Sequence, residues 1–179
     1  MRKVFALALL CTLCATASAQ EPTATQKAEM SKMSFLVGNW KGEGWIITPD
    51  GQRHTFKQTE RIQSKLGGTA ILIEGEGKSR VGDKGEEVTM FQSLAIINYD
   101  DRGKRYRFLS QTNQGYYNES EARVIEGGME WGFRLPQAGR IRYTIKINEK
   151  GEWLEIGEFS PDEKSWRKFH EMTLQRVKD

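Results

Sequence analysis

The sequence of 179 residues predicts an all-β fold: a single antiparallel up-and-down β-barrel of about ten strands with a short N-terminal helix. The first observation behind this prediction is a series of turn motifs that divides the chain into segments of strand length. The second is the alternation of apolar and polar residues within several segments, which is typical of strands buried on one face. The helix is expected between residues 27 and 35, where the apolar residues have mixed spacing.

Nine turn motifs mark the expected ends of the strands. Each contains a glycine that can take a positive φ, a proline that presets φ, or an aspartate or asparagine that favours a turn. They lie at 49–51, 66–68, 82–85, 101–103, 113–115, 127–128, 136–139, 149–151 and 160–162. Because short turns join successive strands, neighbours in sequence are expected to pair, and closure of so long a sheet removes its exposed edges. A two-sheet sandwich has similar strand signals and is the alternative.

The alternation also indicates which residues face the core. Residues 140–147 place every apolar side chain on one face, and residues 129–133 follow the same pattern. In the last segment, one parity holds Trp166, His170, Met172 and Leu174. Residues 94–97 are apolar on both faces, so we expect the N-terminal helix to cover their outer side.

The first residues have the layout of a secretory signal peptide. Arg2 and Lys3 precede an apolar run at 4–15, and Ala17-Ser18-Ala19 supplies the small residues at which signal peptidase cleaves. The expected division is a signal peptide at 1–19, a leader with the short helix at 20–34, and a β-barrel domain at 35–179. The apolar run is too short to cross a membrane. We therefore expect an exported protein, periplasmic or extracellular, without a membrane span.

The charge and the cysteine content exclude several classes of function. Cys11 and Cys14 both lie in the predicted signal peptide, so the mature chain has no thiol for a disulfide, for catalysis or for a metal. Removal of Arg2 and Lys3 lowers the formal net charge of +3 by two. The remaining charges are interspersed, whereas nucleic-acid binding needs a concentrated basic face. We expect no nucleic-acid partner.

The start of the first predicted strand carries a recognisable motif. It reads Phe35-Leu36-Val37-Gly38-Asn39-Trp40 and continues Lys41-Gly42-Glu43-Gly44. A Gly-x-Trp at this place resembles the signature of calycins, the superfamily of lipocalins, fatty-acid-binding proteins and nitrobindin-like haem barrels. The longer Gly-x-Trp-x-Gly-x-Gly is most similar to nitrobindins. Together with the ending Thr173-Leu174-Gln175-Arg176, the motif also resembles a family of exported bacterial domains of unknown function.

The resemblance implies a lipocalin-like barrel and gives three residues a structural role. In such barrels Trp40 would plug one end with its large apolar ring, after the turn at Gly38. A basic residue near the end of the last strand commonly packs on this tryptophan, and Arg176 is the matching residue here. The Arg-x-Tyr with which fatty-acid-binding proteins hold a carboxylate is absent from the last segment.

Aromatic residues recur along the chain and predict a ligand-binding interior. The expected ligand-binding residues are Phe56, Phe91, Tyr106, Phe108, Tyr116, Trp131, Tyr143 and His170. An apolar cavity with a few polar groups is the usual form of a small-molecule site, and we expect a small hydrophobic molecule as the partner. A barrel filled by these same side chains, without a ligand, is an alternative. No catalytic residue is predicted, since no nucleophile elbow or triad context is present, and a binding protein is expected rather than an enzyme.

His170 carries a second functional hypothesis. In nitrobindin-like barrels a histidine near the end of the last strand ligates haem iron, so the resemblance implies haem as a cofactor if His170 occupies that place. A hydrogen bond to a carboxylate or to a backbone carbonyl is the alternative role for this side chain. His54, beside a turn, is expected to be exposed. No other cofactor and no metal site is expected, because Glu155, Glu158 and Glu171 are expected to be solvated on the outer surface.

Overall fold

The computed structural model describes residues 24–81 and 85–178. The predicted signal peptide, and the turn at 82–85 except for Gly85, lie outside the described residues. The strands are β1 (Gly38–Ile47), β2 (Arg53–Lys65), β3 (Ala70–Val81), β4 (Glu86–Asp100), β5 (Arg105–Thr112), β6 (Tyr117–Ile125), β7 (Gly128–Leu135), β8 (Gly139–Ile147), β9 (Trp153–Ser160) and β10 (Arg167–Val177).

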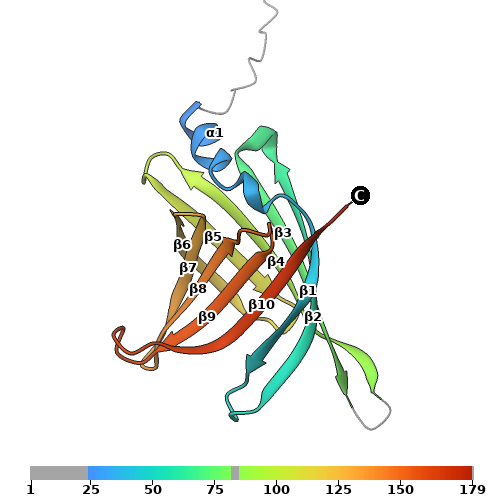
Figure 1. The fold of residues 1–179 in the computed structure, drawn as a ribbon. Coiled ribbons are helices and arrows are strands. Elements are labelled where there is room, and N and C mark those ends of the chain that lie inside the picture. The colour runs from blue at the N-terminus through green and yellow to red at the C-terminus, as the bar shows by residue number, and fades with distance from the viewer. Residues whose placement is uncertain (1–23, 82–84, 179) are drawn as a thin grey trace, which may run out of the picture.

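The ten strands form a closed antiparallel barrel (Figure 1). Each strand pairs with its neighbours in sequence, and β1 pairs with both β2 and β10, from Asn39 opposite Val177 to Ile46 opposite His170. Every strand has a paired neighbour on each side, although β6 and β7 pair only between Ala122–Ile125 and Gly128–Trp131. The predicted up-and-down barrel is confirmed, and the sandwich is excluded.

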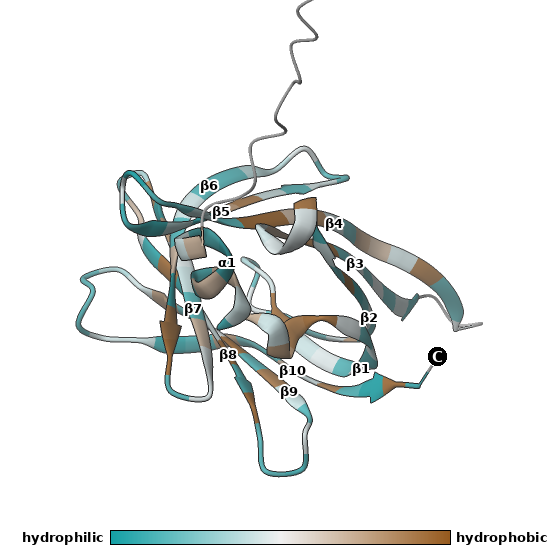
Figure 2. Cartoon of the chain, turned by 90° about the horizontal axis from the view of Figure 1, so that it is seen from above, coloured by the Kyte–Doolittle hydropathy of each residue, from teal (hydrophilic) through white to brown (hydrophobic). Residues whose placement is uncertain are grey.

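A short helix covers one end of this barrel. Helix α1 (Ala24–Ser31) leads into a 3₁₀ turn, η1 (Ser34–Leu36), and both lie across the end at which β1 begins, as the view along the barrel shows (Figure 2). The apolar residues of this segment that are buried are Met30, Met33 and Leu36. A second 3₁₀ turn, η2 (Leu66–Gly68), joins β2 to β3 at the same end. No helix among residues 24–81 and 85–178 has the length and apolar character that a membrane crossing requires.

The position of α1 corrects one expectation from the sequence. Leu94 and Ile96 on the outer face of β4 are 46% and 41% exposed, so the helix does not cover them. Helix α1 instead turns its buried side chain, Met30, toward the core, where the barrel end offers a larger apolar surface.

Trp40 fills the core beneath α1 and η1. It is 1% exposed, and its Nε1 donates a hydrogen bond to the Leu36 carbonyl at 2.8 Å. The Trp153 ring meets it edge-on, with 5.6 Å between the ring centroids. These contacts join the N-terminal segment to β1 and β9.

Arg176, near the end of β10, contacts Trp40 and the N-terminal segment from outside the core. Its guanidinium lies 4.1 Å above the centre of the Trp40 ring and donates to the backbone carbonyls of Phe35, at 2.9 Å, and Val37. Gly38 has a φ of +140°, and a Cβ atom there would overlap the guanidinium. The glycine of the Gly-x-Trp motif is therefore required both by its backbone conformation and by the arginine above it.

Tyr106 on β5 ties α1 to the barrel wall, and this tie gives a first prediction. Its hydroxyl donates to the Glu29 carboxylate at 2.6 Å. Tyr106→Phe is expected to lower the free energy of unfolding by about 1–2 kcal/mol, because a hydrogen bond to a charged group is lost. Urea unfolding would measure the change. Tyr117→Phe, an exposed tyrosine at the other end of the barrel, is the control and should change the free energy by less than about 0.5 kcal/mol.

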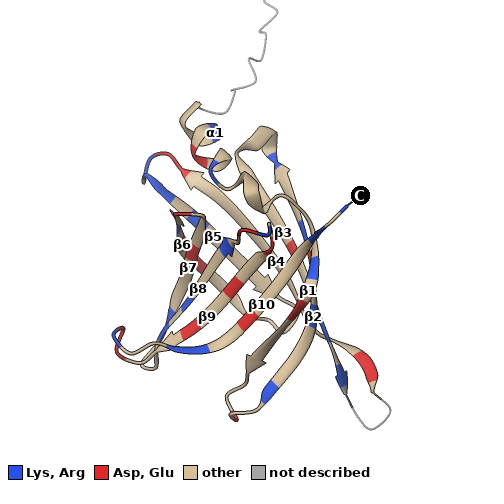
Figure 3. Ribbon diagram, in the orientation of Figure 1, with Lys and Arg blue, Asp and Glu red and all other residues tan. Residues whose placement is uncertain are grey.

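Basic and acidic residues are interspersed along the strands in the view of Figure 3. Many of them form cross-strand ion pairs on the outer face, such as Arg123 with Glu130 at 2.9 Å and Arg142 with Glu158 at 2.7 Å. Such exposed pairs contribute little to stability, about 1 kcal/mol or less each. They do, however, leave this face without a single-sign patch.

Candidate ligand site inside the barrel

The barrel interior is sealed toward α1 and open toward the opposite end. Toward α1, the buried inward side chains are Trp40, Ile62, Ile97, Met129, Ile145, Trp153 and Leu174. Toward the other end, the side chains that follow the inward parity but stay partly exposed are Phe91, Ser93, Ser110, Ser120, Trp131, Phe133, Tyr143 and Phe159. We call the space that these residues line, together with Phe56 and His170, the open half of the barrel. The side chains of this half retain accessible surface, whereas those toward α1 do not.

The structure brings most of the predicted ligand-binding residues together there. Those that line the interior are Phe56, Phe91, Phe108, Trp131, Tyr143 and His170. Tyr106 lies beneath α1 instead, bonded to Glu29. Tyr116 lies in the loop between β5 and β6 and is 70% exposed, away from the interior. His54 is exposed, as expected.

Parallel aromatic rings form one wall of the open half. The rings of Phe108 and Trp131 stack with centroids 4.2 Å apart, and those of Trp131 and Tyr143 stack at 4.5 Å. The three rings come from β5, β7 and β8, and both stacks share Trp131, so the rings form one row. Burial raises the pKa of Tyr143 above its ordinary value, and this hydroxyl is therefore neutral at physiological pH.

His170 faces this row from β10. Its ring stacks on Phe56 with centroids 5.6 Å apart and an interplanar angle of 18°, and it meets Tyr143 edge-on at 5.8 Å. Burial lowers its pKa to about 4, so the imidazole is neutral near pH 7. Its Nε2 is buried and has no hydrogen-bond partner among the residues that the structure describes. Neither of the bonds considered from the sequence is present at this nitrogen.

A bulge separates His170 from Trp166, which the sequence placed on the same face. Lys168 pairs with Glu158 and His170 with Gly157, so Phe169 is an extra residue in the ladder. Trp166 consequently lies on the outer surface, where the Arg142 guanidinium stacks on it at 3.9 Å. The prediction that Trp166 lies on the same face as His170 is wrong, because it assumed a strand without a bulge.

Two buried carboxyl groups face each other across the interior. Glu60 on β2 and Glu155 on β9 are each 8% exposed. Burial raises the pKa of Glu60 to about 7, and burial together with Coulombic repulsion from Glu60 raises that of Glu155 to about 8. Near neutral pH such a pair holds at least one proton, so it can both donate and accept hydrogen bonds. The expectation that Glu155 is solvated on the outer surface is wrong.

The hydrogen bonds of these two groups leave acceptors free. Gln58 Nε2 donates to Glu60 at 2.6 Å, and Trp153 Nε1 donates to Glu155 at 3.2 Å. The second oxygen of Glu60 and the amide oxygen of Gln58 are buried and lack a partner within residues 24–81 and 85–178. Within the described ranges, neither carboxyl group forms an ion pair with a lysine or an arginine. An unpaired buried polar atom costs about 1–3 kcal/mol, which a bound donor would offset.

Sequence reasoning missed Glu60 and Gln58 altogether, although a signal was present. Both share the parity of Phe56 and Ile62, and these four side chains are buried in alternation along β2. Glu155 likewise shares the parity of Trp153 on β9. Polar residues on an apolar face of a strand are the pattern that points to an internal site.

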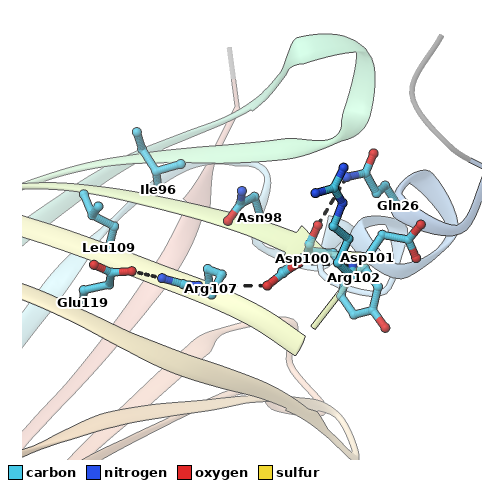
Figure 4. A pocket seen from close by; sticks show the side chains of 10 residues that line it. Gln26, Ile96, Asn98, Asp100, Asp101, Arg102, Arg107, Leu109 and Glu119 are labelled. Carbon is cyan, nitrogen blue, oxygen red and sulfur yellow. Dashed lines mark hydrogen bonds and ion pairs between the residues drawn. The ribbon is translucent and has the colours of Figure 1, made fainter. Parts of the chain in front are cut away.

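Among the described residues, no three His, Cys, Asp or Glu side chains are grouped closely enough to hold a metal ion. A surface hollow of about 660 Å³ lies outside the barrel, over β4 and β5 next to α1 (Figure 4). Most of its charges are already paired, since Arg107 bonds Glu119 and approaches Asp100 at 4.0 Å, and Asp101 pairs with Lys104. An open site whose charges are mostly paired offers little to hold a ligand. The interior is therefore the better candidate.

Comparison with solved structures supports the fold. The chain is similar to Rv2717c from M. tuberculosis, with a TM-score of 0.59 and 12% sequence identity over 88% of this chain and 100% of that one. It is also similar to the S-type phycobiliprotein lyase CPES from Guillardia theta, with a TM-score of 0.55 and 12% identity over 88% of this chain and 99% of that one. The chain has a calycin-like β-barrel fold. No protein-family model and no curated protein matches the sequence.

Proposed function

We propose that this chain is an exported calycin-like barrel that binds a small, largely apolar molecule in its open half and performs no catalysis. The observation that carries the proposal is the contrast between the two ends of the interior. Inward side chains near α1 are fully buried, whereas aromatic and small side chains at the other end of the barrel keep accessible surface. Apolar walls with a few polar groups are typical of small-molecule sites.

The fold supports this proposal, because closed barrels of about eight or more strands have room for one small ligand. One of the solved barrels with this fold is a phycobiliprotein lyase. The nearest alternative is a barrel whose side chains fill the interior and that takes no ligand.

Native mass spectrometry of the mature chain, residues 20–179, tests the proposal directly. The protein would be purified from the compartment in which it accumulates and compared under native and denaturing conditions. We expect an extra mass that disappears on denaturation. A bare protein mass, unchanged after addition of a lipid extract or of haem, would contradict the proposal and support a filled barrel without a ligand. The same purification tests export, because cleavage after Ala19 would make Gln20 the first residue of the mature protein.

A filling substitution locates the ligand within the barrel. Ser120 on β6 faces the interior opposite Phe108 and is partly exposed. Ser120→Phe is expected to weaken ligand binding at least about tenfold, because a ring occupies the open half; a tenfold change corresponds to about 1.4 kcal/mol. Glu121→Phe adds the same ring to the outer face of the same strand and should leave the affinity unchanged. Equal affinity of both variants and wild type would place the ligand elsewhere.

Haem bound through His170 is the second candidate, favoured by the unpartnered Nε2 of that residue. A neutral imidazole with a free nitrogen, held between aromatic rings inside a barrel, fits what haem iron requires of its protein ligand. When bound, haem would supply the redox and gas-binding chemistry that the resemblance to nitrobindins implies. Wild type mixed with haem is then expected to show a Soret band that His170→Ala lacks. His54→Ala, an exposed histidine, is the control, and an identical band in all three proteins would contradict the assignment.

A further inference from the structure

We infer that the ligand of this barrel is a flat, conjugated molecule with a positive charge and N–H donors, which Glu60 and Glu155 receive inside the open half. This inference rests on the proposed function and names the chemical class of its ligand. It is carried by three features: a pair of buried carboxyl groups without a cation, buried acceptors without a donor, and a row of parallel aromatic rings.

The carboxyl pair is built into the wall of the site. Glu60 and Glu155 come from strands separated by β1 and β10, and the Coulombic repulsion of Glu60 on Glu155 acts through the interior. Both border the open half. A Cβ atom at Gly75 would lie 2.6 Å from Ser93 Oγ and 2.7 Å from the Glu60 carboxylate, which places these two groups side by side. Glu155 lies close enough to Tyr143 to affect its titration.

Gly75 shows that this placement is a specific fit. A Cβ atom there would lie within 2.8 Å of both oxygens of Glu60, closer than real contacts allow. Any other residue at this position of β3 would displace the carboxyl group. Glycine in a strand interior costs stability, about 0.5–1 kcal/mol relative to alanine, and here it makes room for a buried acid.

The unpartnered atoms can accept hydrogen bonds: they are an amide oxygen, a carboxyl oxygen and, in one tautomer of the neutral imidazole, a ring nitrogen. Gln58 is 2% exposed, and because its amide nitrogen is bonded to Glu60, its oxygen is left free. The second oxygen of Glu60 and Nε2 of His170 are also free and buried. A ligand rich in N–H groups satisfies such atoms, whereas a fatty acid or another anion would add further acceptors and a repelling charge.

The aromatic row favours a flat ligand. Phe108, Trp131 and Tyr143 stack face to face, so a ring face can be free only at an end of the row, where another flat ring can continue the stack. The positive charge is favoured by the acidic pair, because a cation beside Glu60 and Glu155 reduces the repulsion between them.

Two fluorescent probes of similar shape and opposite charge test the inference. Proflavine is a planar aromatic cation with amino donors, and anthracene-9-carboxylate is a planar aromatic anion. Fluorescence titrations of the mature chain at pH 8 are expected to give proflavine at least about tenfold higher affinity, a difference of about 1.4 kcal/mol. This comparison uses wild type alone and does not depend on how any variant folds.

Variants then assign the binding to the pair. Glu60→Gln and Glu155→Gln keep the shape of each side chain and remove its charge, and the double variant should lose at least tenfold in proflavine affinity. Glu43→Gln, which removes a carboxylate from the exposed outer face of β1, is the matched control and should bind as wild type does. Circular dichroism melting would show that each variant is folded.

The outcomes separate this inference from the proposed function. If the anion binds as well as proflavine, or if the double variant retains wild-type affinity for proflavine, the inference is wrong. If a lipid extract or haem yields a bound mass while proflavine does not bind, the barrel is a carrier of another ligand class and only the inference fails. If no added molecule binds, both fail, and the free acceptors are satisfied by water.

Discussion

At pH 9 the variant with glutamine at both 60 and 155 is expected to be more stable than wild type by a few kcal/mol, although it removes two native side chains. Each unit of pKa difference between the folded and unfolded states is worth about 1.4 kcal/mol. The folded-state pKa values of about 7 and about 8 lie well above the ordinary value of 4.5. Glutamine has no proton to lose, so it avoids the burial of a charge that wild type suffers at high pH.

The direction in which stability changes with pH follows from proton binding. Between about pH 4.5 and 8 the folded chain holds protons at Glu60 and Glu155 that the unfolded chain has released. Wild type therefore loses stability as the pH rises through this window, and the loss is complete above the folded pKa values. At pH 4 both carboxyls are protonated in either state, and the double variant and wild type should be nearly equal.

Urea unfolding at pH 4 and pH 9 checks this prediction. Glu43→Gln, on the outer face of β1, should follow the wild-type curve at both values. Parallel pH profiles for wild type and the double variant would show that the two carboxyl groups do not control stability. A stabilised double variant that no longer binds proflavine would show that the acidic pair lowers stability and serves binding, as residues of functional sites often do.

The barrel was predictable from the sequence because its signals are local. Turn motifs such as Pro49-Asp50-Gly51 and Glu149-Lys150-Gly151 lie between strands where they were expected, and each acts through its own backbone conformation. Antiparallel pairing of neighbours then requires only short connections. The placement of Trp40 beneath Arg176, which the family resemblance implied, is present in the structure.

The candidate site was only partly predictable, because its composition depends on strands distant in sequence. Phe108, Trp131 and Tyr143 were expected to line the interior, but the stacking of their rings in a row was not predicted. Glu60 and Glu155 were missed because a carboxylate on a strand is ordinarily solvated, and only closure of the barrel brings the two together. Trp166 was misplaced because the bulge at Phe169 leaves no mark in the alternation of the sequence.

The largest loss of stability is expected from Trp40→Ala, which should lower the free energy of unfolding by about 3–5 kcal/mol. The ring is 1% exposed, contacts Trp153 edge-on, carries the Arg176 guanidinium and donates a hydrogen bond to Leu36. Alanine would leave a cavity beneath η1 that the closed wall cannot collapse to fill. Urea unfolding measures the loss.

Two further variants separate the contributions of Trp40. Trp40→Phe retains a ring but loses the Nε1 donor, so its loss should fall well below that of alanine, at about 1–3 kcal/mol. Trp45→Ala, on the outer face of the same strand beside Arg53, should cost about 1 kcal/mol or less, because that ring is only half-buried. If Trp40→Ala were no more harmful than Trp45→Ala, the sealed end would not depend on this tryptophan. In that case the contrast between a packed end and an open half, on which the ligand site rests, would lose its structural basis.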